Sequence, residues 1–204
     1  MRILRRFITL LLIMSVFACA DIKRMAYDGY DRDNWQQADA VVQKLNIRKG
    51  DIIADLGAGG GYFTFYLADA TGTQGMVYAV DVDKDMTEYL DKEITRLKLT
   101  NIQTLLAEYD DAKLPNGVDL VFSTNTYHHI DNQVAYFTKL KNSLPPKARL
   151  AIIEFKQEGM LGWMGHATAK QTIIDELNEA GFQLVHDFDF LQRQNFLMFS
   201  IEQD

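Results

Sequence analysis

Short apolar runs alternate with amphipathic segments along the chain from Trp35 to the C-terminus. In the amphipathic segments apolar residues recur every three or four positions, as in a helix with one buried face, whereas the apolar runs have the length of buried strands. Strands are expected at 52–56, 76–80, 102–107, 118–123 and 150–155, and helices at 35–45, 62–70, 84–97, 132–144 and 168–180. Asp33 or Asn34 is the expected N-cap of the first helix, and Gly181 should end the last one.

The end of the chain breaks this alternation. Two β-like runs, 182–191 and 196–201, are separated by only four residues. Because a parallel crossover needs about a dozen residues or more, these runs should pair antiparallel as a hairpin. The predicted fold is therefore α/β, a doubly wound sheet that is mostly parallel with one antiparallel strand.

The N-terminal segment has a different character. Three arginines precede an apolar run at 7–18, as in an export signal, and this run is short for a bilayer span. The run leads into Val-Phe-Ala-Cys, which resembles the bacterial lipobox with Cys19 as the lipidated residue. We expect a signal peptide or membrane anchor at 1–19, a tether at 20–33 and the folded domain at 34–204. An uncleaved anchor and a mis-assigned start codon are the alternatives to a lipoprotein signal.

Composition and charge narrow the function. The 204 residues are 48% apolar and 24% charged, which suits one globular domain with a sizeable core. The net charge of −7, or −10 once the three N-terminal arginines are removed, argues against a broad nucleic-acid surface. The single cysteine rules out an intramolecular disulfide and a cysteine-based zinc site.

The strongest chemical signal is a glycine-rich loop between the first expected strand and the next helix, Asp-Leu-Gly-Ala-Gly-Gly-Gly at 55–61. Glycines let the backbone turn sharply and approach a ligand closely. A dinucleotide loop has the spacing GxGxxG, whereas this loop has GxGxG directly after Asp55. The carboxylate would repel a pyrophosphate and suits a ligand with an ammonium group, which disfavours an NAD-dependent oxidoreductase.

A second carboxylate, Asp81, ends the second expected strand, 26 residues after Asp55. A carboxylate at this strand end can accept hydrogen bonds from both hydroxyls of a ribose. The two carboxylates and the loop together fit a nucleoside that carries a zwitterionic amino-acid tail, and S-adenosylmethionine is such a molecule.

On these residues the chain resembles the class I S-adenosylmethionine-dependent methyltransferases, and within them the ubiquinone/menaquinone-methyltransferase-like branch. The resemblance runs from Trp35 to the C-terminus and includes 61–64, 119–121, 127–129, 154–156 and 180–182. It implies a Rossmann-like seven-stranded sheet with one antiparallel strand. The implied cofactor-binding residues are Asp55, Gly57, Ala58, Gly59 and Gly61 for the methionine part, Asp81 and Val82 for the ribose, and Asp110 for the adenine, with Glu108 as the alternative. The helix before the first strand often covers cofactor or substrate in this family, which implicates Trp35 and Tyr30.

The reacting groups are expected after the fourth strand, because ligands bind at the carboxyl edge of such sheets. The sequence there includes Tyr-His-His at 127–129. Histidine titrates near neutral pH, so His128 or His129 is the candidate general base, with Tyr127 shaping the pocket. The alternative is a histidine that only forms hydrogen bonds within its loop.

The fifth strand and the loop after it add further candidates. Glu154 and His166 are expected to line the substrate pocket. Their distance from 128–129 in the sequence gives no metal-ligand spacing, and adjacent histidines diverge in an extended chain, so no metal site is expected. The apolar, glycine-rich segment 159–165 is either a mobile cover over an apolar substrate or a loop packed on the core.

The expected function is transfer of a methyl group from S-adenosylmethionine to an apolar or quinone-like small-molecule acceptor by in-line displacement, with no nucleic-acid partner. The alternative is a binding or interaction lipoprotein that has the fold without turnover. Membrane attachment is expected through the N-terminal segment, and the oligomeric state is not predicted. The export-like signal conflicts with a cofactor that is made in the cytoplasm, and an uncleaved anchor with a cytoplasmic catalytic domain would resolve that conflict.

Overall fold

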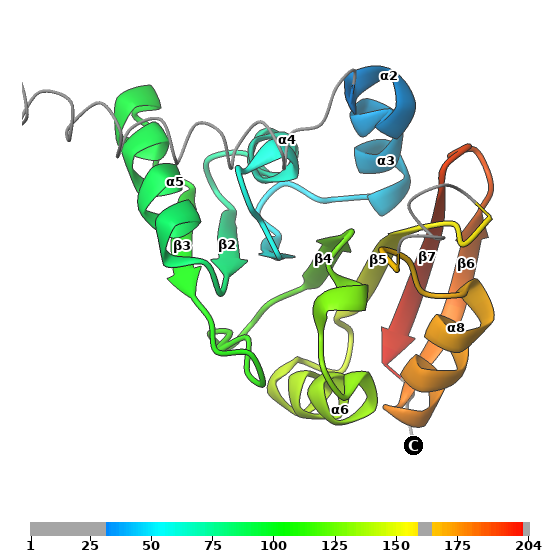
Figure 1. Cartoon of the computed structure of the whole chain (residues 1–204). Coiled ribbons are helices and arrows are strands. Elements are labelled where there is room, and N and C mark those ends of the chain that lie inside the picture. Colours follow the sequence, from blue (N-terminus) through cyan, green and yellow to red (C-terminus); the bar gives the residue numbers. More distant parts are fainter. Residues whose placement is uncertain (1–31, 159–164, 202–204) are drawn as a thin grey trace, which may run out of the picture.

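The computed structural model describes residues 32–158 and 165–201. Seven strands form one sheet in the order β3-β2-β1-β4-β5-β7-β6 (Figure 1). They are β1 Ile52–Leu56, β2 Met76–Asp81, β3 Ile102–Leu106, β4 Leu120–Thr124, β5 Arg149–Phe155, β6 Phe182–Phe188 and β7 Gln194–Ile201. β7 runs antiparallel to both of its neighbours, whereas the other paired strands are parallel. The predicted doubly wound sheet with one antiparallel strand is confirmed.

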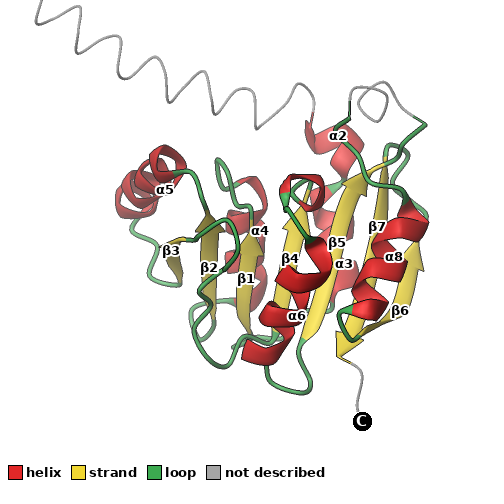
Figure 2. Cartoon of the chain, turned by 60° about the horizontal axis from the view of Figure 1, so that its bottom comes forward, coloured by secondary structure: helices red, strands yellow, loops and turns green. Residues whose placement is uncertain are grey.

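Helices cover both faces of the sheet (Figure 2). α3 Ala38–Leu45, α4 Tyr62–Thr71 and α5 Lys84–Leu97 pack on one face, and α6 Gln133–Ser143 and α8 Lys170–Glu179 pack on the other. On the first face the rings of Phe63 and Phe122 lie 4.8 Å apart, and on the second Tyr127 stacks on Phe137 at 5.4 Å. Because both faces are covered, every residue of β4 is buried, which explains its continuous apolar pattern.

The predicted C-terminal hairpin is also present. Phe182 of β6 pairs with Ile201 of β7, and the register shifts by one residue between Leu184 and His186. Such a shift is a β-bulge, which turns side chains without ending the pairing. β6 ends at Phe188, three residues before its predicted end.

The first predicted helix is wrong as a single helix. α2 Arg32–Gln36 and α3 are separated by Gln37, whose φ of 49° is left-handed. The side chain of Gln36 is buried, and its Nε2 donates to Oγ1 of Thr124 at 2.9 Å. This bond joins α2 to the end of β4, whereas α3 packs against α4, so the two segments have different packing partners.

The predicted N-cap is wrong for the same reason. Asp33 and Asn34 lie inside α2, and the Asp33 carboxylate accepts a hydrogen bond from the Tyr62 hydroxyl at 2.7 Å. Arg32 is helical as well, so helical structure begins within the stretch predicted as a tether.

Several predictions concern residues outside the described ranges. They are the signal or anchor with Cys19, the role of Tyr30, and the segment 159–164. Within 32–158 and 165–201, no helix has the length and apolar character needed to cross a bilayer.

Parallel pairing brings the functional segments together. β1, β2, β4 and β5 end at Leu56, Asp81, Thr124 and Phe155, and their register places these ends at one edge of the sheet. The glycine loop, the turn after β2 and the histidine segment after β4 therefore meet there, as expected for a doubly wound sheet.

Candidate active site

A cleft of about 1150 Å³ lies at this edge of the sheet. The glycine loop, the end of β2, the turn after β3 and the segments after β4 and β5 line it. Arg32 and Trp35 of α2 line it as well. Small-molecule pockets are commonly about 300–1,000 Å³, so the cleft has room for a cofactor together with a second small molecule.

The glycine loop turns tightly against β2. Its φ angles are positive at Gly57 (77°), Gly59 (52°) and Gly61 (85°). The backbone N–H groups of Gly57 and Ala58 donate to the Val80 carbonyl at 2.8 and 3.1 Å. The loop is thereby fixed in place, and its first glycines face the cleft.

Two of the glycines are also required by neighbouring side chains. A Cβ on Gly57 would lie 2.0 Å from Oγ1 of Thr126, and one on Gly61 would lie 2.4 Å from Leu90. Gly61 does not line the cleft, contrary to its predicted contact with the cofactor; it is the N-cap of α4. Gly60, which was not among the predicted residues, does line the cleft.

The Asp81 carboxylate is bonded to the same loop. Its Oδ2 accepts from the Gly59 N–H at 2.7 Å, and its Oδ1 accepts from the Asp83 N–H at 2.8 Å. Burial raises the pKa of Asp81, and these backbone hydrogen bonds act against that rise. A carboxylate oxygen can accept more than one hydrogen bond, so Asp81 can still receive the hydroxyls of a ribose. Val82 beside it lines the cleft too.

Asp55 is the most deeply buried acid of the cleft, with 1% exposure. Its Oδ2 accepts a hydrogen bond from the Thr64 hydroxyl at 2.6 Å. Burial raises the pKa of Asp55 to about 6, against the opposing effects of that hydrogen bond and of the positive charge of Arg32. A cation bound in the cleft would favour the charged carboxylate.

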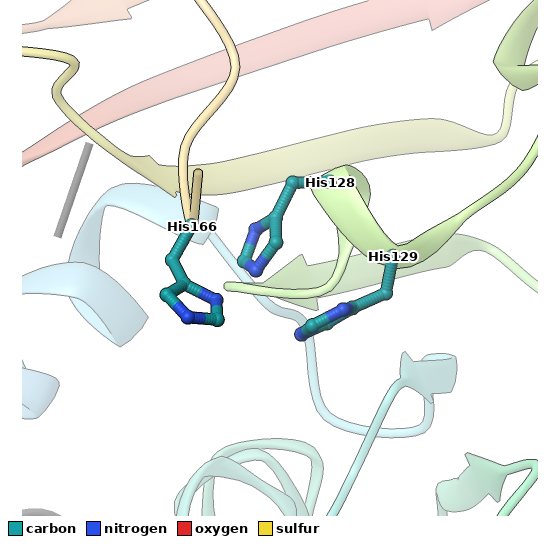
Figure 3. Close-up of side chains that lie close together, drawn as sticks. All are labelled: His128, His129 and His166. Carbon is teal, nitrogen blue, oxygen red and sulfur yellow. The ribbon is translucent and has the colours of Figure 1, made fainter. Parts of the chain in front are cut away.

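Three histidines gather in another part of the cleft (Figure 3). His128 and His129 belong to the 3₁₀ helix η1 Tyr127–His129, and their ring centroids are 4.0 Å apart. The ring of His166, from the loop after β5, lies 5.7 Å from that of His128 and 6.4 Å from that of His129. The expectation that adjacent histidines diverge is wrong because the segment is a tight turn and not an extended strand.

The neighbouring Glu154 acts through one of these rings. Its Oε2 lies 3.0 Å from Nδ1 of His128, and its Oε1 accepts from the Phe155 N–H at 2.9 Å. The Glu154 side chain is fully buried and does not line the cleft, so its predicted place as a pocket-lining residue is wrong. It orients the imidazole that does face the cleft.

The fold and the cleft agree with the comparison to known proteins. Residues 47–194 match a family described as a methyltransferase domain. The chain belongs to this family. A solved S-adenosylmethionine-dependent methyltransferase from Aquifex aeolicus is 26% identical, with a TM-score of 0.81 over 88% of this chain and 97% of that one. The predicted enzyme class, a methyltransferase, is confirmed.

Named relatives of this methyltransferase act on different acceptors. This chain is 24% identical over 156 residues to the demethylmenaquinone methyltransferase of Geobacillus sp. (strain WCH70). The alignment covers 67% of this chain and 62% of the relative. The chain is 27% identical over 99 residues to the (S)-coclaurine N-methyltransferase of Thalictrum flavum subsp. glaucum, covering 48% of this chain and 27% of the relative. The chain therefore spans less than two thirds of the length of both relatives.

The acid after β3 differs from the prediction. Asp110 lies outside the cleft, with 82% of its side chain exposed and its carboxylate 3.6 Å from Nζ of Lys139. Glu108, the alternative, lines the cleft together with Tyr109. The backbone of Glu108 and Asp111 forms a narrow antiparallel bridge, which turns the intervening Asp110 away.

The prediction that Tyr127 lines the pocket is wrong, whereas Trp35 does line the cleft. Tyr127 is fully buried, and its hydroxyl donates to Oε2 of Glu176 at 2.6 Å, so it belongs to the core below α6 and α8. Burial and the Glu176 carboxylate raise its pKa. Trp35 lines the cleft as predicted and stacks on Phe155 at 5.8 Å.

Besides Gly60, the cleft residues that sequence reasoning missed include Thr126 and Arg32. Thr126 stands in the segment after β4, so its position relative to that strand was a usable signal. Arg32 carried no such signal, because it precedes the predicted helix. It lines the cleft because it belongs to α2, the separate short helix before Gln37. Its guanidinium lies 4.0 Å above the Tyr62 ring.

Proposed function

We propose that this methyltransferase binds S-adenosylmethionine in the cleft and transfers the methyl group to a small-molecule acceptor by in-line displacement. One observation carries the proposal: a single cleft contains both the glycine loop with Asp81 and the group of three histidine rings. The loop and Asp81 suit the amino-acid and ribose parts of the cofactor, and the imidazoles suit the acceptor.

The charges of the cleft support this cofactor. S-adenosylmethionine has a sulfonium and an ammonium group, and Asp55, Asp81 and Glu108 all line the cleft. Burial, and to a smaller extent the charge of Asp81, raise the pKa of Asp55. An ammonium group bound nearby would act in the opposite direction and favour the charged carboxylate. When bound, the cofactor supplies the methyl group on a positively charged sulfur.

The histidines are suited to handling the acceptor's proton. Partial burial and the adjacent His128 lower the pKa of His129, so its ring is neutral at pH 7 and can accept a proton. Glu154 lies against Nδ1 of His128 and orients that ring, so Nε2 is the nitrogen that can face an acceptor. Either imidazole can therefore act as the base where the acceptor loses a proton around attack.

The acceptor we infer is apolar and planar, such as a quinol or a phenol. The stacked rings of Trp35 and Phe155 form an aromatic wall of the cleft, and Ile130 adds aliphatic surface. The name of the Geobacillus relative, a demethylmenaquinone methyltransferase, supports a quinone-like acceptor. The surplus of acidic residues supports a small molecule over a nucleic acid.

Calorimetric titration of the full chain with S-adenosylmethionine and S-adenosylhomocysteine tests the cofactor, with NAD as the control. We expect micromolar binding of the first two and none of NAD, followed by methylation of a quinol or phenol in a panel of acceptors. A folded sample that binds neither contradicts the proposal. Binding without methylation of any acceptor would favour the non-catalytic alternative.

We further propose that residues 1–19 attach the protein to a membrane, by lipidation of Cys19 or as an uncleaved anchor, with the residues between 19 and α2 as a tether before the catalytic domain. The basic and apolar segments and the lipobox-like 16–19 support this location. Incorporation of labelled palmitate that is lost in Cys19→Ala would support lipidation. Membrane-bound protein that retains Met1 would instead support the uncleaved anchor, and full-length protein found only in the soluble fraction would contradict both.

A further inference from the structure

The three histidines of the cleft are close enough to share one ligand. One ring nitrogen from each of His128, His129 and His166 lies within 4.8 Å of the other two. The rings point toward a common space, from η1 on one side and from the loop after β5 on the other (Figure 3). Within the described ranges, the rings of His129 and His166 have no hydrogen-bond or ion-pair partner, so their nitrogens are available.

Glu154 completes an arrangement that is common around metal ions. A histidine that binds a metal through one ring nitrogen usually donates the hydrogen of the other to a carboxylate or carbonyl, which fixes its tautomer. Glu154 Oε2 accepts from Nδ1 of His128 at 3.0 Å, and Glu154 is fully buried. Nε2 is therefore the nitrogen of His128 that is left to bind an ion.

We propose that His128, His129 and His166 bind one divalent transition-metal ion of the zinc type, with Glu154 orienting His128. Three neutral imidazoles favour Zn²⁺ and its first-row neighbours over Mg²⁺ or Ca²⁺, which prefer oxygen ligands. Zinc–nitrogen bonds of about 2.0–2.1 Å in a tetrahedron place the nitrogens about 3.3 Å apart. The exposed rings of His129 and His166 can close the remaining distance by rotating about their side-chain bonds.

Three protein ligands leave a fourth position open to the cleft, which is the pattern of catalytic zinc sites. The role of the ion rests on the methyl transfer proposed above, whereas its binding does not. An acceptor hydroxyl at the open position would release its proton to solvent more readily. Its oxygen would then form the new bond to the methyl carbon while the carbon–sulfur bond breaks and its electron pair stays on sulfur. The acceptor class is thus a hydroxyl compound that can ligate the ion.

The test measures metal binding by the full chain without any acceptor. The protein is freed of metal by dialysis against a chelator and titrated with Zn²⁺ in competition with a chromogenic chelator. We expect one Zn²⁺ per chain with a Kd of micromolar or below. His129→Ala and His166→Ala should each weaken binding at least tenfold. His186→Ala is the matched control, because His186 is the chain's fourth histidine and stacks on Phe188 in β6, away from the cleft.

A second variant examines the positioning role. Glu154→Gln should weaken Zn²⁺ binding about 10- to 100-fold, the usual effect of losing a carboxylate that orients a metal-bound histidine. With Co²⁺ in place of Zn²⁺, the visible absorption of a tetrahedral site should appear in the unaltered protein and be lost in His166→Ala. The proposal is overturned if Zn²⁺ does not bind, if His129→Ala and His166→Ala bind it as tightly as the unaltered protein does, or if His186→Ala abolishes binding.

The same samples separate the two proposals. Titration with S-adenosylhomocysteine reports on the cofactor part of the cleft and requires no metal. Zn²⁺ binding without cofactor binding would remove the proposed function and keep the metal site. Cofactor binding without Zn²⁺ binding would remove the metal site and leave a histidine base as the activating group.

Discussion

Oε2 of Glu154 lies 3.0 Å from Nδ1 of His128, and this contact joins the end of β5 to the 3₁₀ helix that follows β4. The same oxygen accepts from the backbone N–H of His128 at 3.3 Å, and the other oxygen accepts from that of Phe155 at 2.9 Å. One buried carboxylate therefore satisfies donors from two segments of the cleft wall. Its removal should affect stability as well as chemistry.

We expect Glu154→Ala to lower the free energy of unfolding by about 1–3 kcal/mol, because donors that are buried or partly buried lose their partner. Urea unfolding followed by circular dichroism measures this. Glu158→Ala is the control, since Glu158 is exposed three residues after β5. Equal stability of the two variants would show that the Glu154 contacts contribute nothing measurable.

Asp81 should dominate the affinity for the nucleoside. Hydrogen bonds to a charged group contribute about 1.5–3 kcal/mol, so Asp81→Ala should raise the Kd of S-adenosylhomocysteine at least about tenfold. Asp81→Asn, which keeps one acceptor oxygen, should have an intermediate effect. Asp69→Ala, at an exposed carboxylate on α4, should leave the Kd unchanged. Unchanged affinity in folded Asp81→Ala would contradict the ribose assignment.

Asp55 should make the stability of the cofactor-free protein depend on pH. Burial raises its pKa from 3.8 to about 6, so between these values the folded protein holds a proton that the unfolded chain releases. The stabilisation is therefore greatest below about pH 4 and is lost as the pH rises through 6. Asp55→Asn removes this titration.

The measurement compares urea unfolding of both proteins from pH 4 to pH 7. Relative to Asp55→Asn, the unaltered protein should lose about 2–3 kcal/mol across this range, since one pKa unit corresponds to about 1.4 kcal/mol. A constant difference between the two proteins would mean that Asp55 keeps an ordinary pKa. Saturating S-adenosylmethionine should reduce the loss, because its ammonium group favours the charged carboxylate.

The sequence predicted the sheet well because its signals are local. β1 and α5 have the predicted bounds, since the apolar run at 52–56 and the helical spacing at 84–97 are each bounded by polar or turn residues. The glycine loop and Asp81 were also identified, because spacing from a strand end is a property of the chain itself.

Other features depend on contacts between distant segments. The break at Gln37 follows from the bond between Gln36 and Thr124, which are 88 residues apart. The histidine cluster joins η1 to a loop after β5, and spacing along the chain does not encode it. Asp110 and Glu108 both stand near the end of β3, and only the narrow bridge after that strand decides which of them faces the cleft.

Gly57 of the glycine loop lies against the segment after β4 that contains the histidines. Its φ of 77° disfavours a side chain, and an added Cβ would lie 2.0 Å from Oγ1 of Thr126. We expect Gly57→Ala to lower the free energy of unfolding by about 2–4 kcal/mol through backbone strain and this overlap together. It should also weaken S-adenosylhomocysteine binding, because the loop cannot keep its turn.

Two variants divide this effect into its causes. Gly50→Ala has a similar φ of 93° with no heavy atom closer than 4.0 Å, so it should show only the strain, about 1–2 kcal/mol. Adding Thr126→Gly to Gly57→Ala removes the overlapping atoms and should recover the stability lost by Gly57→Ala beyond the strain. The cost of Gly57→Ala is therefore measured twice, in the unaltered protein and in Thr126→Gly. If Gly57→Ala lowers the free energy of unfolding equally in both, the contact between the two loops does not determine the need for glycine at position 57.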